Sequence, residues 1–332
     1  MISEVLLDVR RGGQGPSKIP VLFPKLVFLY DSDLHGPGAP LEDLFDKAVE
    51  TAKLCMCPDF LSLDAGYVGE TYRKWGKIIS PMGCRAFLSH EFKNSGTSVP
   101  ADDNDELEIY RCNLGVVSLN LPMIWMKAKK SGLPFFDVLD EYMEIARGIG
   151  KKTAKYLYNL TASSDPLLFM EGGLDGGTLG PTERIEPILR KSTLSFGYGS
   201  LHEINMMETG SRLSEDPGYA LSVLDHINDK VGQFKKEDGL LWAIYGTPGE
   251  SWLPLACTQF IKEFGKRKGI TDNGFFTNSF HMHVSDDLTP IEKIDRESVF
   301  FPRSTGGCIC HIKVPGIGPE QDPGIAAIIR HA

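Results

Sequence analysis

Segments with the apolar pattern of buried strands alternate along this chain with segments of helical periodicity. Residues 20–30 are rich in β-branched and aromatic side chains, whereas residues 41–54 place apolar side chains at helical spacing, with acidic residues in the first turn. The pattern predicts strands at 20–30, 113–121, 193–204, 240–245, 275–284 and 308–314, and helices at 41–54, 133–160, 216–234, 251–268, 290–299 and 322–331. Strands that alternate with helices favour an α/β fold with a mainly parallel sheet under helical cover.

Glycine-rich and polar stretches interrupt this pattern. Residues 62–80 read as an irregular stretch and residues 94–108 as an acidic surface loop, while Gly148 and Gly150 predict a weak point in the helix at 133–160. The chain begins almost at its first strand and stops inside an apparent helix. We therefore expect the fold to be truncated at both ends.

Composition excludes several classes of protein. The 332 residues contain 35 Lys and Arg against 44 Asp and Glu, a net charge of −9, so no basic footprint for nucleic acid or anionic membrane is present. The longest apolar run, at 19–30, is interrupted by Pro20, Pro24 and Lys25, and the N-terminus has no signal-peptide pattern. Seven cysteines, an odd number, are typical of reduced thiols. We expect a cytoplasmic protein without a nucleic-acid or membrane partner.

Cys84 lies between Gly83 and Arg85, just after a Pro-Met turn. The glycine permits a close backbone approach, and a cation beside a thiol favours the thiolate. An isolated cysteine is nevertheless more often an inert small apolar residue, so spacing alone leaves both interpretations of Cys84 open.

The segment GTPGES at 246–251 follows a predicted strand and precedes a predicted helix. Unpaired N–H groups at such a helix start can bind an anion, with the Thr247 and Ser251 hydroxyls as further donors. The alternative is a capped helix, with Thr247 as N-cap, Pro248 in the first turn and Glu250 closing a capping box. The two interpretations are compatible.

Histidine and cysteine clusters give weaker signals. His202 and Glu203 could form an acid–base pair, but neighbours on a strand point to opposite faces. Three groups of cysteine and histidine have spacings that could suggest a zinc site. None of them offers a complete set of ligands, so we expect no metal site in this chain. These groups are Cys55 with Cys57, Cys308 with Cys310 and His311, and His281 with His283.

Six segments together resemble the oxygen-sensitive, anaerobic ribonucleoside-triphosphate reductases, which are glycyl radical enzymes. They occur in the family's order across nearly the whole chain. The segments are FPKLVF at 23–28, SPMGCRAFL at 80–88, RCNLGVVSLNLP at 111–122, LSFGYGSLHE at 194–203, YGTPGES at 245–251 and TNSFH at 277–281.

This resemblance implies a ten-stranded α/β barrel, of which residues 1–332 would form a single, incomplete catalytic domain. Cys84 matches the cysteine whose thiyl radical takes the 3′ hydrogen from the ribose, and Asn113 matches the asparagine that binds the sugar hydroxyls. The implied phosphate-binding residues are Thr247, Pro248, Gly249, Glu250 and Ser251, and we expect Arg85 and Ser118 to contribute to substrate binding. A catalytic base is not obvious, and Glu250 and Glu203 are the candidates.

The same resemblance implies cofactors and partners. The family carries a glycyl radical near its C-terminus, installed by an S-adenosylmethionine and iron–sulfur activase, and a four-cysteine zinc site precedes it. Neither segment follows Cys310, and the N-terminal allosteric region is also missing, so the isolated chain is expected to be inactive. A ribonucleoside triphosphate substrate, formate or a redoxin as reductant, and a homodimer are implied for the full-length form.

Two alternatives remain open from the sequence. One is another glycyl radical enzyme of the formate-lyase or dehydratase type, which would need no phosphate-binding turn. The other is a truncated, non-catalytic fragment that binds nucleotide or serves only as an assembly partner.

Overall fold

The computed structural model describes residues 2–21, 23–64, 66–78, 81, 86, 102, 105, 112–174, 177–314 and 322–332. The chain forms two compact units. The first unit comprises Met1–Ile78, Leu288–Asp295 and His311–Ala332, and the second comprises Ile79–Asp287 and Arg296–Cys310. Within the described ranges, no helix combines the length and the apolarity that a bilayer crossing requires.

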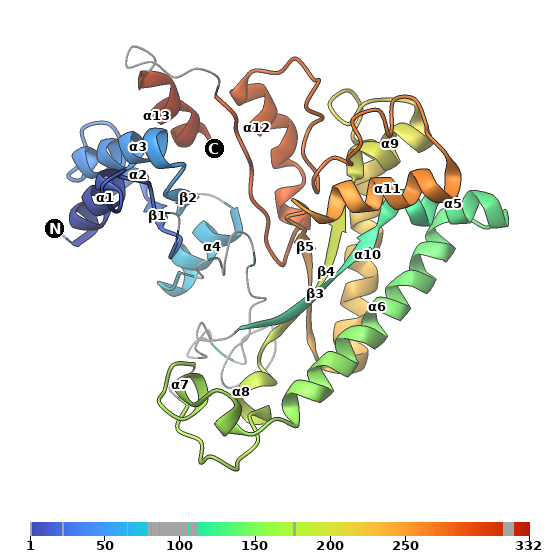
Figure 1. Ribbon diagram of the computed structural model, residues 1–332, viewed down its shortest axis with the longest axis horizontal. Helices are drawn as coiled ribbons and strands as arrows, with labels where there is room; N and C mark the ends of the chain where they lie inside the picture. Colours follow the sequence, from blue (N-terminus) through green and yellow to red (C-terminus); the bar gives the residue numbers. More distant parts are fainter. Residues whose placement is uncertain are drawn as a thin grey trace. The chain divides into compact units, whose positions relative to one another are not determined.

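The first unit joins a two-stranded parallel sheet to helices from both ends of the chain (Figure 1). Its core cluster contains Tyr30, Phe45 and Val49, against which Ile325 and Ile329 also pack. The elements of the unit are α1 Ile2–Gly12, β1 Val27–Tyr30, α2 Ser32–His35, α3 Glu42–Cys55, β2 Asp59–Ser62, α4 Gly66–Trp75, α13 Asp322–His331 and the first part of α12 Pro290–Ser298.

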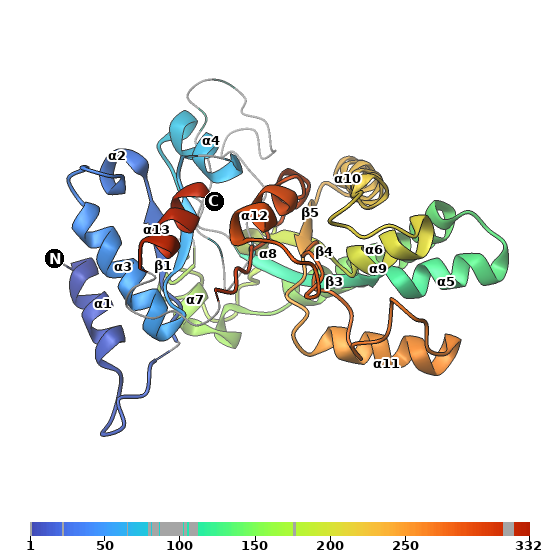
Figure 2. The same ribbon diagram turned by 90° about the horizontal axis from the view of Figure 1, so that it is seen from above.

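The second unit is built on a parallel sheet with the strand order β3–β4–β5. Figures 1 and 2 show the long helices α6 and α10 running beside this sheet. The elements are β3 Asn113–Asn120, α5 Leu121–Ser131, α6 Phe135–Tyr158, η1 Ala162–Ser164, α7 Pro166–Phe169, α8 Glu186–Leu189, β4 Thr193–Gly199, α9 Leu201–Thr209, α10 Gly218–Asp238, β5 Leu241–Gly246, α11 Trp252–Phe264, the end of α12, and η2 Phe301–Arg303.

One face of the three-stranded sheet is apolar and lies under α6 and α10. Phe196 of β4 packs against Trp242 of β5 and Phe234 of α10, with ring centroids 5.0 and 5.8 Å apart. Gly150 lets α6 approach closely, because a Cβ there would lie 2.5 Å from the Trp242 ring. α6 is continuous through Gly148 and Gly150, so the predicted weak point was wrong. The glycine serves packing between the helix and the sheet.

The parallel α/β architecture and the helices near 41–54, 133–160, 216–234, 251–268, 290–299 and 322–331 are confirmed. Strands at 113–120 and 241–246 also match. Of the described residues in the range 20–30, only Val27–Tyr30 form a strand, because Pro20 and Pro24 cannot donate to a ladder.

Several other predictions of secondary structure were wrong. Residues 201–204 begin helix α9, since β4 already ends at Gly199. No strand forms at 275–284, where Ser279 has a positive φ of 40° and the carbonyls of Thr277 and Ser279 accept from the start of α9. Residues 308–314 are also irregular. Helix α4 occupies part of the stretch at 62–80, and α5 follows β3 unpredicted.

The structure confirms the predicted α/β fold class. The described residues contain five strands, two in one sheet and three in the other. They therefore establish an α/β fold, and the ten-stranded barrel is not confirmed by these strands. The barrel and the assignment of 1–332 to one incomplete catalytic domain stay predictions.

Candidate functional site

Several small polar residues lie on the second face of the β3–β4–β5 sheet, where Val116 is an apolar neighbour. Because side chains alternate along a strand, Ser195 and Gly197 of β4 face away from Phe196 and its helices. Ser118 of β3 pairs with Gly197 in the sheet register and lies on the same face. This set of residues, with Asn113 and Thr247, is called the polar face below. A face built from hydroxyl, amide and glycine can hold a polar ligand close to the backbone.

Asn113 begins β3 and is held in one orientation. Its Nδ2 donates to Ser195 Oγ at 2.7 Å, and its Oδ1 accepts the Gly115 N–H at 2.9 Å. An asparagine amide has two N–H donors and two acceptor lone pairs, so one of each is left for a ligand. Asn113 is neutral, and it can bind hydroxyl groups without competing for their protons. Ser195 was not predicted as a site residue, because a serine within a strand carries no distinctive sequence signal.

A hydroxyl pair links β3 to the end of β5. Ser118 Oγ and Thr247 Oγ1 are 2.9 Å apart, and both lie over Gly197. A Cβ on Gly197 would stand 2.2 Å from Thr247 Oγ1 and 2.3 Å from Ser118 Oγ. The glycine at position 197 is therefore required for this pair to form.

The turn at 247–251 connects β5 to α11, as predicted, but it does not cap the helix in the predicted way. Ser251, rather than Thr247, occupies the N-cap position, and it makes no side-chain capping bond. The Thr247 hydroxyl is turned toward Ser118, and its N–H donates to the Tyr198 carbonyl at 3.1 Å. Gly249 is buried against the Leu253 side chain, while Glu250 and Ser251 are exposed. The capping-box interpretation was wrong.

The structure thus brings Ser118 and Thr247 together and places Asn113 at the opposite end of the polar face. Asn113 lies five residue positions before Ser118 along β3, which corresponds to about 16 Å of strand. A single ligand touching both Asn113 and the turn would have to lie extended along the face. Pro248 and Gly249 continue the turn beyond Thr247. Cys84 and Arg85 lie outside the described residues, so their roles stay predictions.

His202 and Glu203 lie in the first turn of α9, next to the end of β4. Glu203 is 2% exposed, and burial raises its pKa to about 7. Burial and the neighbouring His283 lower the pKa of His202 to about 4, and the two imidazole rings stack with centroids 4.6 Å apart. Their placement on a helix corrects the strand-based argument that set them on opposite faces of a sheet.

Among the remaining cysteine and histidine groups, His281 and Cys310 both contact Glu297. His281 Nδ1 and Cys310 Sγ each lie 3.1 Å from Glu297 Oε2, and the Met282 N–H donates to Glu297 Oε1. Cys55 and Cys57 are buried in the first unit. Among the described residues, no group of three or more His, Cys, Asp or Glu side chains could hold a metal ion.

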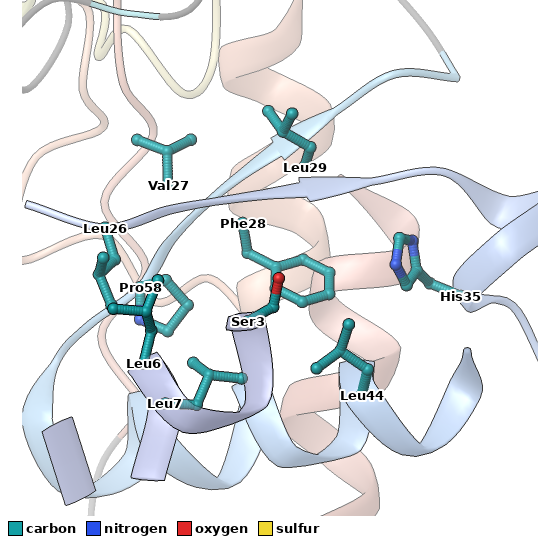
Figure 3. A pocket seen from close by; sticks show the side chains of 10 residues that line it. All are labelled: Ser3, Leu6, Leu7, Leu26, Val27, Phe28, Leu29, His35, Leu44 and Pro58. Atoms are coloured by element: carbon teal, nitrogen blue, oxygen red, sulfur yellow. The ribbon is translucent and has the colours of Figure 1, made fainter. Parts of the chain in front are cut away.

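A cavity of about 250 Å³ in the first unit is unsuited to binding a polar ligand. In Figure 3, Phe28 points from β1 toward Leu7 and Leu44, and Val27 and Leu29 point to the other side of the strand. Ser3 and His35 are the polar side chains among its lining residues. Such an apolar cavity lacks the converging polar groups of the second unit.

Comparison with known proteins identifies a family. The family model described as anaerobic ribonucleoside-triphosphate reductase matches residues 1–332. The anaerobic ribonucleoside-triphosphate reductase of Escherichia coli strain K12 is 33% identical over 324 residues, which are 96% of this chain and 44% of that protein. The enzyme of the same name from enterobacteria phage T4 is 30% identical and is covered over 50% of its length. The chain therefore spans about half the length of the curated relatives it matches.

Solved structures show the same fold. An anaerobic ribonucleotide reductase from Thermotoga maritima with citrate in the active site aligns with a TM-score of 0.63 at 14% identity, covering 99% of this chain and 52% of that one. The Thermotoga maritima enzyme in complex with dATP and CTP aligns with a TM-score of 0.61 at 14% identity, covering 93% of this chain and 46% of that one.

Proposed function

The chain belongs to the anaerobic ribonucleoside-triphosphate reductase family, and we propose that it forms part of the catalytic unit that reduces ribonucleoside triphosphates to 2′-deoxyribonucleoside triphosphates for DNA synthesis. The observation that carries the proposal is the polar face, which joins Asn113, Ser118 and the turn at 247–251 on one side of a parallel sheet. Ligands of parallel α/β sheets bind at the carboxyl ends of the strands, where this turn lies.

Each group has a proposed role. The turn at 247–251 holds the substrate phosphates, because N–H groups at the start of the 13-residue helix α11 favour negative charge. Ser118 fixes the Thr247 hydroxyl in this turn. Asn113, held by Ser195, hydrogen-bonds the ribose hydroxyls with its remaining donor and acceptor. An extended substrate would then lie along β3.

The proposed chemistry begins at Cys84. A thiyl radical on Cys84 takes the hydrogen atom from C3′ of the ribose. The resulting carbon radical allows the neighbouring 2′-hydroxyl to take up a proton and leave as water, while the 3′-hydroxyl gives up its proton. S–H and C–H bonds are close in strength, so the abstraction is reversible. Asn113 orients the sugar for both steps, and a closed site protects the radical from water.

The remaining components are proposed from family membership. A glycyl radical on a segment outside this chain would take the hydrogen atom from Cys84. A radical S-adenosylmethionine activase would install this glycyl radical. Formate or a redoxin would supply the electrons, a zinc site would accompany the glycyl radical segment, and the full-length form would be a homodimer. Since the chain covers 44% of its Escherichia coli relative, we propose that it needs the remaining segments for turnover.

Calorimetric titration of CTP into the 332-residue chain tests the binding part. The wild type should bind CTP, and Thr247→Ala should weaken binding about tenfold or more, because a hydrogen bond to a charged phosphate is lost. Thr258→Ala is the matched control, since Thr258 is exposed on α11 and bonds only its own helix at Pro254. Equal CTP affinity of Thr247→Ala and wild type would contradict the phosphate role of the turn.

The catalytic part needs the complete reductase. Cys84→Ser in that enzyme should abolish deoxynucleotide formation, while the glycyl radical signal in electron paramagnetic resonance remains. Retained turnover would exclude Cys84 as the hydrogen-abstracting residue. If the complete wild-type protein binds CTP but shows no turnover, the result would favour the alternative in which this chain binds nucleotide without taking part in catalysis.

A further inference from the structure

A buried carboxyl group connects the end of β4 to the segment at 277–279. Glu203 Oε1 accepts two hydrogen bonds from Thr277, from its N–H at 2.6 Å and from its hydroxyl at 2.8 Å. Both residues are buried. A buried acceptor with two donors holds its partner tightly, because no water competes for these hydrogen bonds.

The backbone reinforces the same connection. The Ser200 N–H donates to the Thr277 carbonyl at 3.0 Å, and the Leu201 N–H donates to the Ser279 carbonyl at 3.2 Å. Ser200 and Ser279 have φ angles of 68° and 40°, although neither is a glycine. Such conformations are unfavourable for residues with a side chain and persist only when the surroundings hold them in place. The segment at 277–279 is therefore held in a defined conformation against α9.

Asn278, at the centre of this segment, faces the turn at 247–251. The Gly249 N–H lies 3.4 Å from Asn278 Oδ1, at the long end of hydrogen-bonding distance. Leu253 packs closely against Gly249, because a Cβ at this position would lie 2.4 Å from the Leu253 side chain. A chain of contacts thus leads from Glu203 through Thr277 and Asn278 to Gly249.

We propose that Glu203 is a positioning residue for the phosphate-binding turn, which it orients through Thr277 and Asn278. This inference rests on the proposed function, because it assigns Glu203 to the same nucleotide site. It also assigns a role to the segments 194–203 and 277–281, which carry the family resemblance but have no role of their own in the proposed function. In this role, the Glu203 carboxyl group accepts the two hydrogen bonds from Thr277 and takes no part in proton transfer.

Glutamine at position 203 separates positioning from acid–base chemistry. Glu203→Gln keeps the Oε1 acceptor for Thr277 and replaces Oε2, which has no hydrogen-bond partner among the described residues. Glu203→Ala removes the acceptor. A positioning residue tolerates glutamine, whereas a proton donor or acceptor does not.

The test is the affinity of the 332-residue chain for CTP and for inorganic tripolyphosphate, together with the melting temperature of each variant. We expect Glu203→Ala to weaken both affinities about tenfold, and Glu203→Gln to stay within about twofold of wild type. Asn278→Ala, which cuts the last contact, should also weaken both. Glu208→Ala is the matched control on α9, because Glu208 bonds Trp125 and Lys129 outside this chain of contacts.

Each contrary result has a distinct meaning. Wild-type affinity in both Glu203→Ala and Asn278→Ala would overturn the inference alone, and so would a glutamine variant as weak as the alanine variant. Failure of wild type to bind CTP would overturn the proposed function as well. If Glu203→Ala does not fold, Thr277→Val replaces it, since it removes one donor and keeps the shape of the side chain; unchanged affinity in Thr277→Val and Asn278→Ala would then be decisive against the inference.

Discussion

At the scale of single residues, Gly197 determines whether the polar face can exist. The hydroxyls of Ser118 and Thr247 meet above it, from β3 and from the turn after β5. Any side chain on Gly197 would occupy the space of that pair. The absence of a Cβ at one strand position thus connects two segments that are far apart in the sequence.

Gly197→Ala should therefore break the Ser118–Thr247 pair and lower the free energy of unfolding by about 1–3 kcal/mol, the usual effect of overpacking. CTP affinity should fall with it. Gly232→Ala is the control, because a Cβ on that α10 residue meets nothing within 4 Å and alanine favours a helix. Chemical denaturation of both variants checks the prediction, and a Gly197→Ala protein of wild-type stability and affinity would contradict it.

His202 and Glu203 should affect stability with opposite dependence on pH. Glu203 has a pKa near 7 in the folded chain against 4.5 in the reference state, so its contribution falls as the pH rises from about 4.5 to 7. His202 has a pKa near 4 against 6.5, so its contribution increases as the pH rises from about 4 to 6.5. Between pH 4.5 and 6.5 the two effects oppose each other.

Urea unfolding between pH 4.5 and 7.5 can separate them. Relative to wild type, Glu203→Gln should gain stability as the pH rises, by roughly 3 kcal/mol across the range. His202→Gln should lose stability relative to wild type up to pH 6.5. Variant and wild-type curves that run parallel would show that neither side chain titrates as its burial implies.

The chemical residue types of the site were predictable, and their contacts were not. Thr247 and Ser118 were named from the sequence, yet their mutual hydrogen bond depends on the register of three strands. The sequence leaves Glu203 as a candidate base, and the strand predicted there argues against an acid–base pair with His202. The contacts of Glu203 with Thr277 became visible only once α9 was known to begin at Leu201, because 74 residues separate the two partners.

At the scale of elements, α6 contains two glycines, of which only Gly150 allows close packing of the helix against the sheet. Gly150 faces Trp242, which is 1% exposed and donates its indole N–H to Asp238 at 3.1 Å. Gly148, two residues earlier, has nothing within 4 Å of a built Cβ. The two positions differ only in the face of the helix they occupy.

Gly150→Ala should cost about 1–3 kcal/mol of unfolding free energy, since Trp242 has no room to move. Gly148→Ala should be neutral or stabilise by up to about 1 kcal/mol, through helix propensity. Thermal unfolding of this pair checks the argument. Equal shifts in melting temperature would contradict a specific contact with Trp242.

Elements with strong local signals were predicted well. Helices at 42–55, 135–158 and 218–238 carry long apolar stripes, and the strands β3 and β5 have β-branched or apolar runs. The apolar runs at 275–284 and 308–314 contain no strand, because burial of an aromatic-rich segment does not require a ladder. Periodicity reports which side chains are buried, whereas strand formation depends on a distant partner.

At the scale of the whole molecule, the first unit combines distant parts of the chain. Ile325 and Ile329 of α13 pack on the cluster of Tyr30, Phe45 and Val49. Arg330 also pairs with Glu42 at 3.2 Å. The core of this unit is incomplete without residues from the other end of the sequence, an arrangement that no local pattern could predict.

Ile329→Ala should lower the protection of α3 amides against hydrogen exchange, at a cost of about 1–3 kcal/mol for a partly buried side chain. Amides in α6 and α10 should be unaffected, since they belong to the second unit. Ile145→Ala, on an exposed α6 side chain, is the control. Unchanged α3 protection in Ile329→Ala would contradict the role of α13 in this core.

The split origin of the first unit also affects how the protein is made. A ribosome that has released β1, α3 and β2 must translate residues 79–321 before α13 can emerge. At about 5–20 residues per second this interval lasts roughly 10 to 50 seconds. Throughout that time the nascent cluster around Phe45 is without its last helix. The growing polypeptide can therefore complete its second unit before α13 packs on this cluster.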